Sequence, residues 1–342
     1  PPPFDASALD RYAEIVAGCK KLGMEPLVTL FHFSHPLWLG LDPWLYGEAV
    51  IDPFLRYVEH TVREVNSRLV QTHGTSPVSY WITINEPAMV PLASYLLKVH
   101  PRGNGAGGRK HFATALENML LAHVAAYEAI HRVYREQGWE RPTVTLNGWA
   151  SAVYPMDFLL LDLLHAPRGG RSPEGVAGVL RERKKVFSRQ MEHSPCRRSQ
   201  TWKQRLVEKL IARVIESGMG REPMPALTQR VFSDSACAPW MDVLAFDYYD
   251  PFIGDYLESK SLFHYHIRQD PWEWGLTPEG LGGFLDAYAS LAGEKPVHIV
   301  ENGMCYAFRD GKAEPRPDGA DRVEVLKAHL FECIRARNRG RP

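Results

Sequence analysis

Two kinds of hydrophobic pattern alternate along the chain. Short runs of apolar, often β-branched residues are typical of buried parallel strands, and segments with apolar residues every three or four positions are typical of amphipathic helices. The first pattern predicts strands at 27–31, 78–84, 143–146, 242–246 and 296–300. The second predicts helices near 7–22, 54–69, 111–137, 278–291 and 321–334, the first capped by Asp5 or Ser7 and ended by Gly23. The connections are long enough for parallel pairing, so the pattern predicts five βα units.

Polar side chains stand at or just past the end of every predicted strand: His32, Asn85, Glu86, Asn147, Asp247, Tyr248 and Glu301. Five strands suit either an open doubly wound sheet or part of an eight-stranded barrel. Functional groups drawn from many strand ends are typical of the barrel, whereas a doubly wound sheet concentrates them at one switch point. We therefore expect an α/β fold, an incomplete (β/α)8 TIM barrel with about five of the eight units, forming a single domain over residues 1–342.

Two of these strand ends carry a glutamate, in Asn85-Glu86-Pro87 and in Glu301-Asn302-Gly303. Two carboxylates at the carboxyl ends of strands far apart in sequence suggest a paired-carboxylate active site. Each motif alone has a simpler interpretation. A glutamate before proline can cap the next helix, Asn-Gly is a turn signal, and a single histidine such as His32 is more often an interior residue than a ligand.

The composition limits the classes of partner, metal site and location, but it does not indicate a reaction. The formal net charge of zero gives no reason to expect nucleic acid or an acidic membrane as a main partner. The five cysteines lack C-x-x-C spacing and are odd in number, which indicates free thiols and neither a zinc site nor a disulfide framework. No apolar stretch reaches the length of a membrane span, and the first residues do not resemble a signal peptide. The default expectation is a soluble cytoplasmic protein.

One segment departs from this neutral balance. Residues 165–213 hold 13 Lys or Arg against 4 Asp or Glu, a local excess of +9. One hypothesis is a surface that binds a polyanion or an anionic membrane. The other is a solvated helical insertion whose charge is balanced elsewhere, and the neutral total favours it.

The strand-end motifs also carry a family resemblance. The run Glu25-Pro26-Leu27-Val28-Thr29-Leu30-Phe31-His32-Phe33 resembles the third barrel strand of glycoside hydrolase family 1, the β-glucosidase family. In the same order, residues 81–87 look like its fourth strand, 246–249 like its sixth, 274–281 like the segment leading into the next helix, and 300–303 like its seventh. Five motifs in register make the resemblance specific over most of the chain.

The resemblance implies a retaining β-glycosidase acting on β-glucosides or related β-linked sugars, with no metal or organic cofactor. Glu86 would be the acid/base and Glu301 the nucleophile that forms a glycosyl-enzyme intermediate. Asn85 would bind the sugar 2-hydroxyl and His32 a ring hydroxyl. Tyr248 would hold Glu301 in place and keep it ionised. The expected partner is a small carbohydrate, with no nucleic acid and no membrane.

Departures from the family pattern bear on activity. Asp247 stands where the family usually has Asn, which adds a negative charge near Glu301. The resemblance begins at the helix before the third barrel strand and ends before the eighth, so it implies truncation at both ends. A barrel without three strands has two unpaired edges. The alternatives are thus a catalytically impaired fragment or pseudoenzyme that only binds sugar, an oligomer that completes the barrel, or an unrelated open-sheet enzyme.

Overall fold

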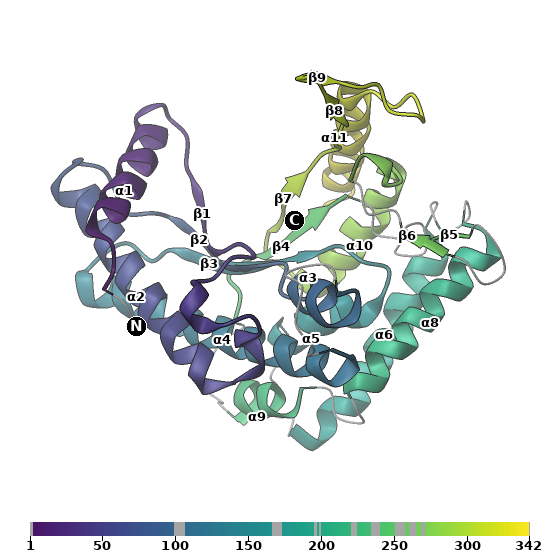
Figure 1. The fold of residues 1–342 in the computed structure, drawn as a ribbon, viewed down its shortest axis with the longest axis horizontal. Helices are drawn as coiled ribbons and strands as arrows, with labels where there is room; N and C mark the ends of the chain where they lie inside the picture. Colours follow the sequence, from purple (N-terminus) through teal and green to yellow (C-terminus); the bar gives the residue numbers. More distant parts are fainter. Residues whose placement is uncertain are drawn as a thin grey trace. The chain divides into compact units, whose positions relative to one another are not determined.

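A computed structural model describes residues 3–98, 107–165, 173–194, 197, 200–219, 224–233, 240–249, 257–259, 265–267 and 271–341. Within these residues the fold is α/β (Figure 1). Its parallel strands are β1 (Leu27–Phe31), β2 (Tyr80–Asn85), β3 (Thr143–Trp149), β4 (Leu244–Tyr248) and β7 (Val297–Asn302). The chain divides into two compact units, the first made of Pro1–Asn147 and Met224–Val243, the second of Gly148–Pro223 and Leu244–Pro342.

The first unit contains β1, β2 and β3 up to Asn147, paired in parallel in that order. Its helices are α1 (Ala6–Lys21), α2 (Glu48–Gln71), α3 (Met89–Pro91), α4 (Arg109–Gln137) and α9 (Pro225–Ser233), with short helical turns η1 (Leu37–Leu39), η2 (Pro43–Leu45) and η3 (Leu92–Leu96). Helix α2 packs against both α1 and α4. The Asp5 carboxylate accepts hydrogen bonds from the Ser7 and Ala8 amides, so Asp5 is the N-cap of α1, as one of the two predicted alternatives had it.

A buried hydroxyl ties β2 to the helices of the first unit. The side chains of Trp81 on β2 and Asn66 on α2 both donate to the Tyr134 hydroxyl on α4, each at 2.8 Å. That hydroxyl donates in turn to the Val78 carbonyl oxygen, just before β2. Because a buried polar group without a partner costs free energy, this closed set of bonds favours one position of β2.

A carboxylate ties the segment before β4 to the start of β3. Asp242 accepts hydrogen bonds from the Val144 amide and the Tyr127 hydroxyl, both at 2.8 Å, and contacts His131 Nε2 at 3.0 Å. Burial acts to raise the pKa of Asp242, but the bonds from His131, Val144 and Tyr127 outweigh it and lower the pKa to about 2. Asp242 is therefore ionised. Arg141 also contacts its carboxylate at 2.6 Å, so four groups bind this side chain.

The second unit contains β4 and β7, which pair in parallel. Its helices are α5 (Phe158–His165), α6 (Pro173–Glu192), α8 (Trp202–Met219), α10 (Leu281–Ala292) and α11 (Arg322–Asn338), with helical turns η4 (Tyr154–Met156), η6 (Pro271–Glu273) and η7 (Pro278–Gly280). Two short antiparallel pairs are β5 (Leu257–Ser259) with β6 (Tyr265–Ile267) and β8 (Phe308–Arg309) with β9 (Lys312–Ala313). Tyr288 of α10 stacks on Phe246 of β4 with ring centroids 4.1 Å apart, which joins helix and strand in the core.

The predicted secondary structure is largely confirmed, because each predicted strand and helix has an observed counterpart. The basic segment is helical, in α6 and α8, and several of its cations are paired: Arg183 with Asp162 and Lys184 with Glu216. Among the described residues, no helix is long and apolar enough to cross a membrane. The α/β class with parallel strands is confirmed, whereas one barrel domain spanning the whole chain stays a prediction.

Candidate active site

Both predicted site segments of the first unit contain strained backbone. Phe33, which follows His32 after β1, has φ +67°, and Glu86, which follows Asn85 after β2, has φ +40°. Residues other than glycine rarely adopt this left-handed region, and such strain persists only where the surroundings enforce it, often at functional sites. The Glu86 amide donates to the Asn147 carbonyl oxygen at 2.9 Å, which holds this turn against β3.

A β-bulge in β2 changes the direction of the last residues of this strand. The pairing runs from Ile82 opposite Thr145 to Asn85 opposite Asn147, so β2 uses one residue more than β3 over this stretch. An extra residue of this kind bends the strand and turns the following side chain. The bulge lies immediately before Asn85 and Glu86, so it sets the direction in which both side chains leave the strand.

Asn85 and Asn147 form a buried amide pair at this end of the sheet. The Asn147 Nδ2 donates to the Asn85 Oδ1 at 2.7 Å, and both residues are buried. This bond fixes the Asn85 amide with its nitrogen turned away from Asn147. No described residue accepts a hydrogen bond from that nitrogen. The arrangement therefore leaves one oriented donor for a ligand.

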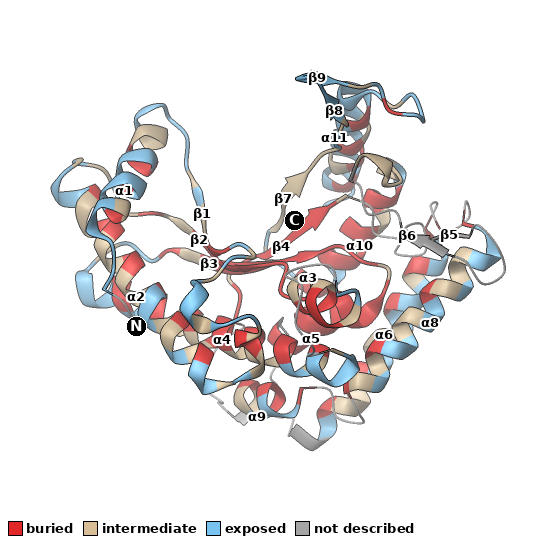
Figure 2. Ribbon diagram, in the orientation of Figure 1, coloured by how far each residue is buried: buried red, intermediate tan, exposed pale blue. Residues whose placement is uncertain are grey.

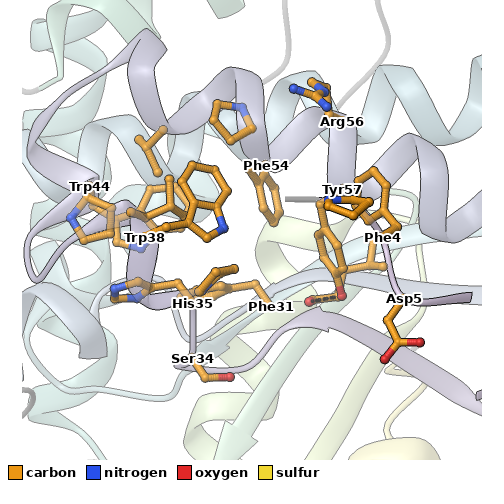
Figure 3. Close-up of a pocket in the computed structure, with 17 residues that line it drawn as sticks. Phe4, Asp5, Phe31, Ser34, His35, Trp38, Trp44, Phe54, Arg56 and Tyr57 are labelled. Carbon is orange, nitrogen blue, oxygen red and sulfur yellow. Dashed lines mark hydrogen bonds between the residues drawn. The ribbon is translucent and has the colours of Figure 1, made fainter. Parts of the chain in front are cut away.

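His32 is exposed and makes an edge contact with Phe33, with ring centroids 5.1 Å apart. The interpretation of His32 as an interior histidine is thereby wrong. Beside this strand end lies an aromatic cavity of about 500 Å³, bounded by the segment before α1, the end of β1, the loop through η1 and η2, and α2 (Figure 3). Trp44 in its wall is buried and packs edge-on against Phe31 and Phe54, as expected for a core residue, whereas Trp38 is exposed.

The second unit carries Glu301 at the end of β7, opposite Asp247 on β4. A bulge precedes Glu301, because Phe246 pairs with Ile299 whereas Asp247 pairs with Glu301. A carboxylate oxygen of Asp247 lies within 4.8 Å of one of Glu301. The carboxyl group that the sequence predicted near Glu301 is therefore present, on a side chain that is fully buried.

Tyr249, and not Tyr248, is the tyrosine that contacts Glu301. The Tyr249 hydroxyl donates to Glu301 Oε2 at 2.9 Å, whereas the Tyr248 hydroxyl donates to the Thr277 carbonyl oxygen at 2.7 Å. The role predicted for Tyr248 is wrong for a geometric reason. Side chains alternate between the two faces of a strand, and Tyr248 lies on the face opposite to Asp247, where it packs against Phe284 and His329. The same alternation is the signal that points to Tyr249.

Further hydrogen bonds, to backbone carbonyl oxygens of β4 and to Asp157 in the core, hold the strand ends of the second unit in place. The Ala150 amide, just past β3, donates to the Asp247 carbonyl oxygen at 2.9 Å, and the Asn302 side chain donates to the Tyr248 carbonyl oxygen at 2.7 Å. Asp157 accepts the Tyr288 hydroxyl in the core. Burial and the Asp157 charge raise the pKa of Tyr288 well above its usual value, so the hydroxyl keeps its proton and remains a donor.

The structure thus brings the predicted residues together in two groups. The first unit joins Asn85 and Asn147 beside Glu86, and the second joins Asp247, Tyr249 and Glu301. Glu86 and Glu301 belong to different units, and their pairing stays a prediction. Within either unit taken by itself, the described residues include no cluster of three side chains that could hold a metal ion.

Comparison with known proteins decides the family. Residues 3–167 match the family model described as glycosyl hydrolase family 1. This part of the chain is similar to that family. The resemblance inferred from the motifs is thereby confirmed, and it places the chain among the glycoside hydrolases.

Relatives extend the likeness over nearly the whole chain. The 6-phospho-beta-galactosidase of Clostridium acetobutylicum is 23% identical over 96% of this chain and 67% of its own length. Beta-glucosidase A of Thermotoga maritima is 24% identical over 98% of this chain and 66% of its own length. A solved structure of the Thermotoga maritima beta-glucosidase with noeuromycin superposes with a TM-score of 0.63 at 19% identity, covering 100% of this chain and 68% of the other. The chain spans about two thirds of the length of these relatives.

Proposed function

We propose that the chain carries the site of a retaining β-glycosidase, with Glu86 and Glu301 as its two carboxylates at the strand ends of a (β/α)8-type barrel. The observation that carries the proposal is the Tyr249 hydrogen bond to Glu301 at a bulged strand end. That bond engages one carboxylate oxygen and leaves the other for a substrate. The matching bulge and strained backbone at Glu86 support it as the second reacting group.

The chemistry proceeds in two displacements. In the first, a Glu301 oxygen attacks the anomeric carbon while Glu86 gives its proton to the departing glycosidic oxygen, so the C–O bond breaks as the glycosyl ester forms. In the second, Glu86 takes a proton from a water molecule, which attacks the same carbon and releases Glu301 as a carboxylate. This mechanism needs the two carboxyl groups roughly 5 to 5.5 Å apart.

Asn85 and His32 supply binding groups on the first unit. The Asn85 nitrogen, turned away from Asn147, is available to donate to a sugar hydroxyl, and the 2-hydroxyl is the one whose hydrogen bonds strengthen in the transition state. His32 is exposed at the neighbouring strand end and can bind a second hydroxyl. Positioning of this kind converts binding energy into rate when the bonds are strongest in the transition state.

The substrate class is a β-glycoside. Relatives are named for β-glucosides and for 6-phospho-β-galactosides, so the choice between a neutral and a phosphorylated sugar is part of the test. Hydrolysis of 4-nitrophenyl β-glucoside, 4-nitrophenyl β-galactoside and their 6-phosphates would be measured for the folded chain. We expect turnover of at least one of them.

The variants Glu301→Gln and Glu86→Gln test the assignment, with Glu294→Gln as the control because Glu294 is exposed just after α10. Loss of turnover in the first two and normal turnover in the control would support the proposal. A folded chain that hydrolyses none of these substrates, or equal activity of Glu301→Gln and the parent, would contradict it.

A further inference from the structure

Helix α8 exposes a continuous apolar stripe. Trp202, Leu206, Leu210 and Val214 follow one another at four-residue intervals and are 71%, 49%, 49% and 45% exposed. Residues four apart are neighbours on one face of a helix, and the 12 steps from Trp202 to Val214 span about 18 Å. Figure 2 shows exposed positions recurring along α8. Scattered exposed apolar residues need no explanation, but a contiguous stripe of this length marks an interaction surface.

Three cations lie within or beside this stripe. Lys203, Lys209 and Arg213 are exposed, and no described residue forms an ion pair with them. At 100° per residue, they fall with the stripe inside an arc of about 140°. The exposed face of α8 therefore combines four apolar side chains with three positive charges.

Both acidic residues of α8 pair with cations that lie outside this helix. Glu216 pairs with Lys184 of α6 at 2.6 Å, and α6 and α8 lie side by side (Figure 1). Glu208 is buried and pairs with Arg197. Ile215 and Met219 are buried as well. Packing and ion pairing thus engage the buried and the acidic residues of α8, and its apolar and cationic face is left to a partner.

We propose that α8 binds the surface of an anionic phospholipid bilayer, lying in its plane. A helix with apolar residues on one face and Lys or Arg beside them places the apolar side chains at the boundary of the acyl chains, while the cations reach the anionic head groups. Trp202 has the amphipathic ring that is enriched at membrane interfaces. An anionic membrane was one of the two hypotheses for the basic segment 165–213, and the exposed face of α8 favours it over a solvated insertion.

Charge and composition favour a bilayer over the other occupants. A polyanion such as RNA or a sulfated polysaccharide would use the three cations but leave the tryptophan and three aliphatic side chains in water. A second copy of the chain would bring three cations against three like charges. An anionic bilayer satisfies both components, because its head groups are negative and its interior is apolar.

The test is co-sedimentation of the whole chain with vesicles of phosphatidylcholine containing one third phosphatidylserine, and with vesicles of phosphatidylcholine alone. We expect binding to the first, at least tenfold weaker binding to the second, and weakening by salt. Each cation near the surface contributes about fivefold in affinity. A Lys203→Glu/Lys209→Glu/Arg213→Glu variant should therefore lose on the order of a hundredfold or more.

A Leu206→Glu/Leu210→Glu variant tests the apolar component and should also abolish sedimentation. The matched control is Leu330→Glu/Phe331→Glu, which changes two exposed apolar residues of α11 in the same way. Equal circular dichroism spectra and melting temperatures establish that all variants are folded. The proposal is overturned by equal binding to both vesicle types, by equal losses in the control, or by retention on heparin without vesicle binding. Concentration-dependent dimerisation that the Leu206→Glu/Leu210→Glu variant abolishes, without vesicle binding, would overturn it as well.

Discussion

The Tyr249 hydroxyl donates a hydrogen bond to Oε2 of Glu301 at 2.9 Å, and so links the residue just past β4 to the end of β7. The register of the two strands makes this contact possible, because Asp247 pairs with Glu301 and Tyr249 lies two residues further along the strand direction. The bond fixes the orientation of the Glu301 carboxylate.

Removing that hydroxyl tests its part in the reaction. A hydrogen bond to a charged group is worth about 1.5–3 kcal/mol, so Tyr249→Phe should lower kcat by about 10- to 100-fold with little change in KM. Tyr12→Phe, at an exposed position in α1, serves as the control and should keep the parent rate. A pH–rate profile of Tyr249→Phe that matches the parent in both height and shape would refute the role.

Asn147 should act through Asn85. Asn147→Ala removes the donor to Asn85 Oδ1 and leaves a buried oxygen without that partner, at a cost of about 1–3 kcal/mol in unfolding free energy. The freed Asn85 amide should also lower kcat/KM for a β-glucoside more than for the corresponding 2-deoxy sugar, because only the first has the 2-hydroxyl. Equal losses on both substrates would show that the pair has only a structural role.

Asp242 should make stability depend on acid. Its pKa falls from the ordinary 3.8 to about 2 in the folded chain, so its contribution is present above pH 3.8 and is lost as the pH falls through 2. The shift corresponds to about 2 kcal/mol. Denaturant unfolding of Asp242→Asn should show that deficit at pH 7 and a smaller one near pH 3. A deficit that is constant with pH would contradict the assignment.

Two glycine substitutions should have opposite effects. An added Cβ at Gly148 would lie 2.7 Å from Asp157 Oδ1 in the core, so Gly148→Ala should destabilise by about 1–3 kcal/mol. The same change at Gly18, inside α1 with nothing within 4 Å of the new carbon, should stabilise by about 0.5–1 kcal/mol. Melting temperatures of the two variants decide this, and a neutral Gly148→Ala would show that the core yields there.

Hydrophobic periodicity predicts the elements well because strands and helices bury one face with characteristic spacing. The strand at 27–31 and the helix near 7–22 are observed as Leu27–Phe31 and Ala6–Lys21. The bulges before Glu86 and Glu301 leave no mark in composition, since a register shift depends on the neighbouring strand.

Burial was harder to predict than periodicity. The spacing of Trp202, Leu206 and Leu210 is that of a face packed on a core, yet these side chains are exposed. A helical period shows that apolar residues share one side, but not what covers them. The role predicted for Tyr248 was wrong for a different reason. The alternation of side chains along β4 continues one residue past its end, so Tyr249 lies on the same face as Asp247 and contacts Glu301.

The most direct test of the two-carboxylate mechanism is covalent trapping. The folded chain would be incubated with 2,4-dinitrophenyl 2-deoxy-2-fluoro-β-glucoside, which forms the glycosyl ester quickly and hydrolyses it slowly, and then digested for peptide mass spectrometry. We expect one added fluoroglycosyl group on Glu301, absent in Glu301→Gln. A label on any other side chain, such as Asp247, or no label on a chain that hydrolyses β-glucosides, would contradict it.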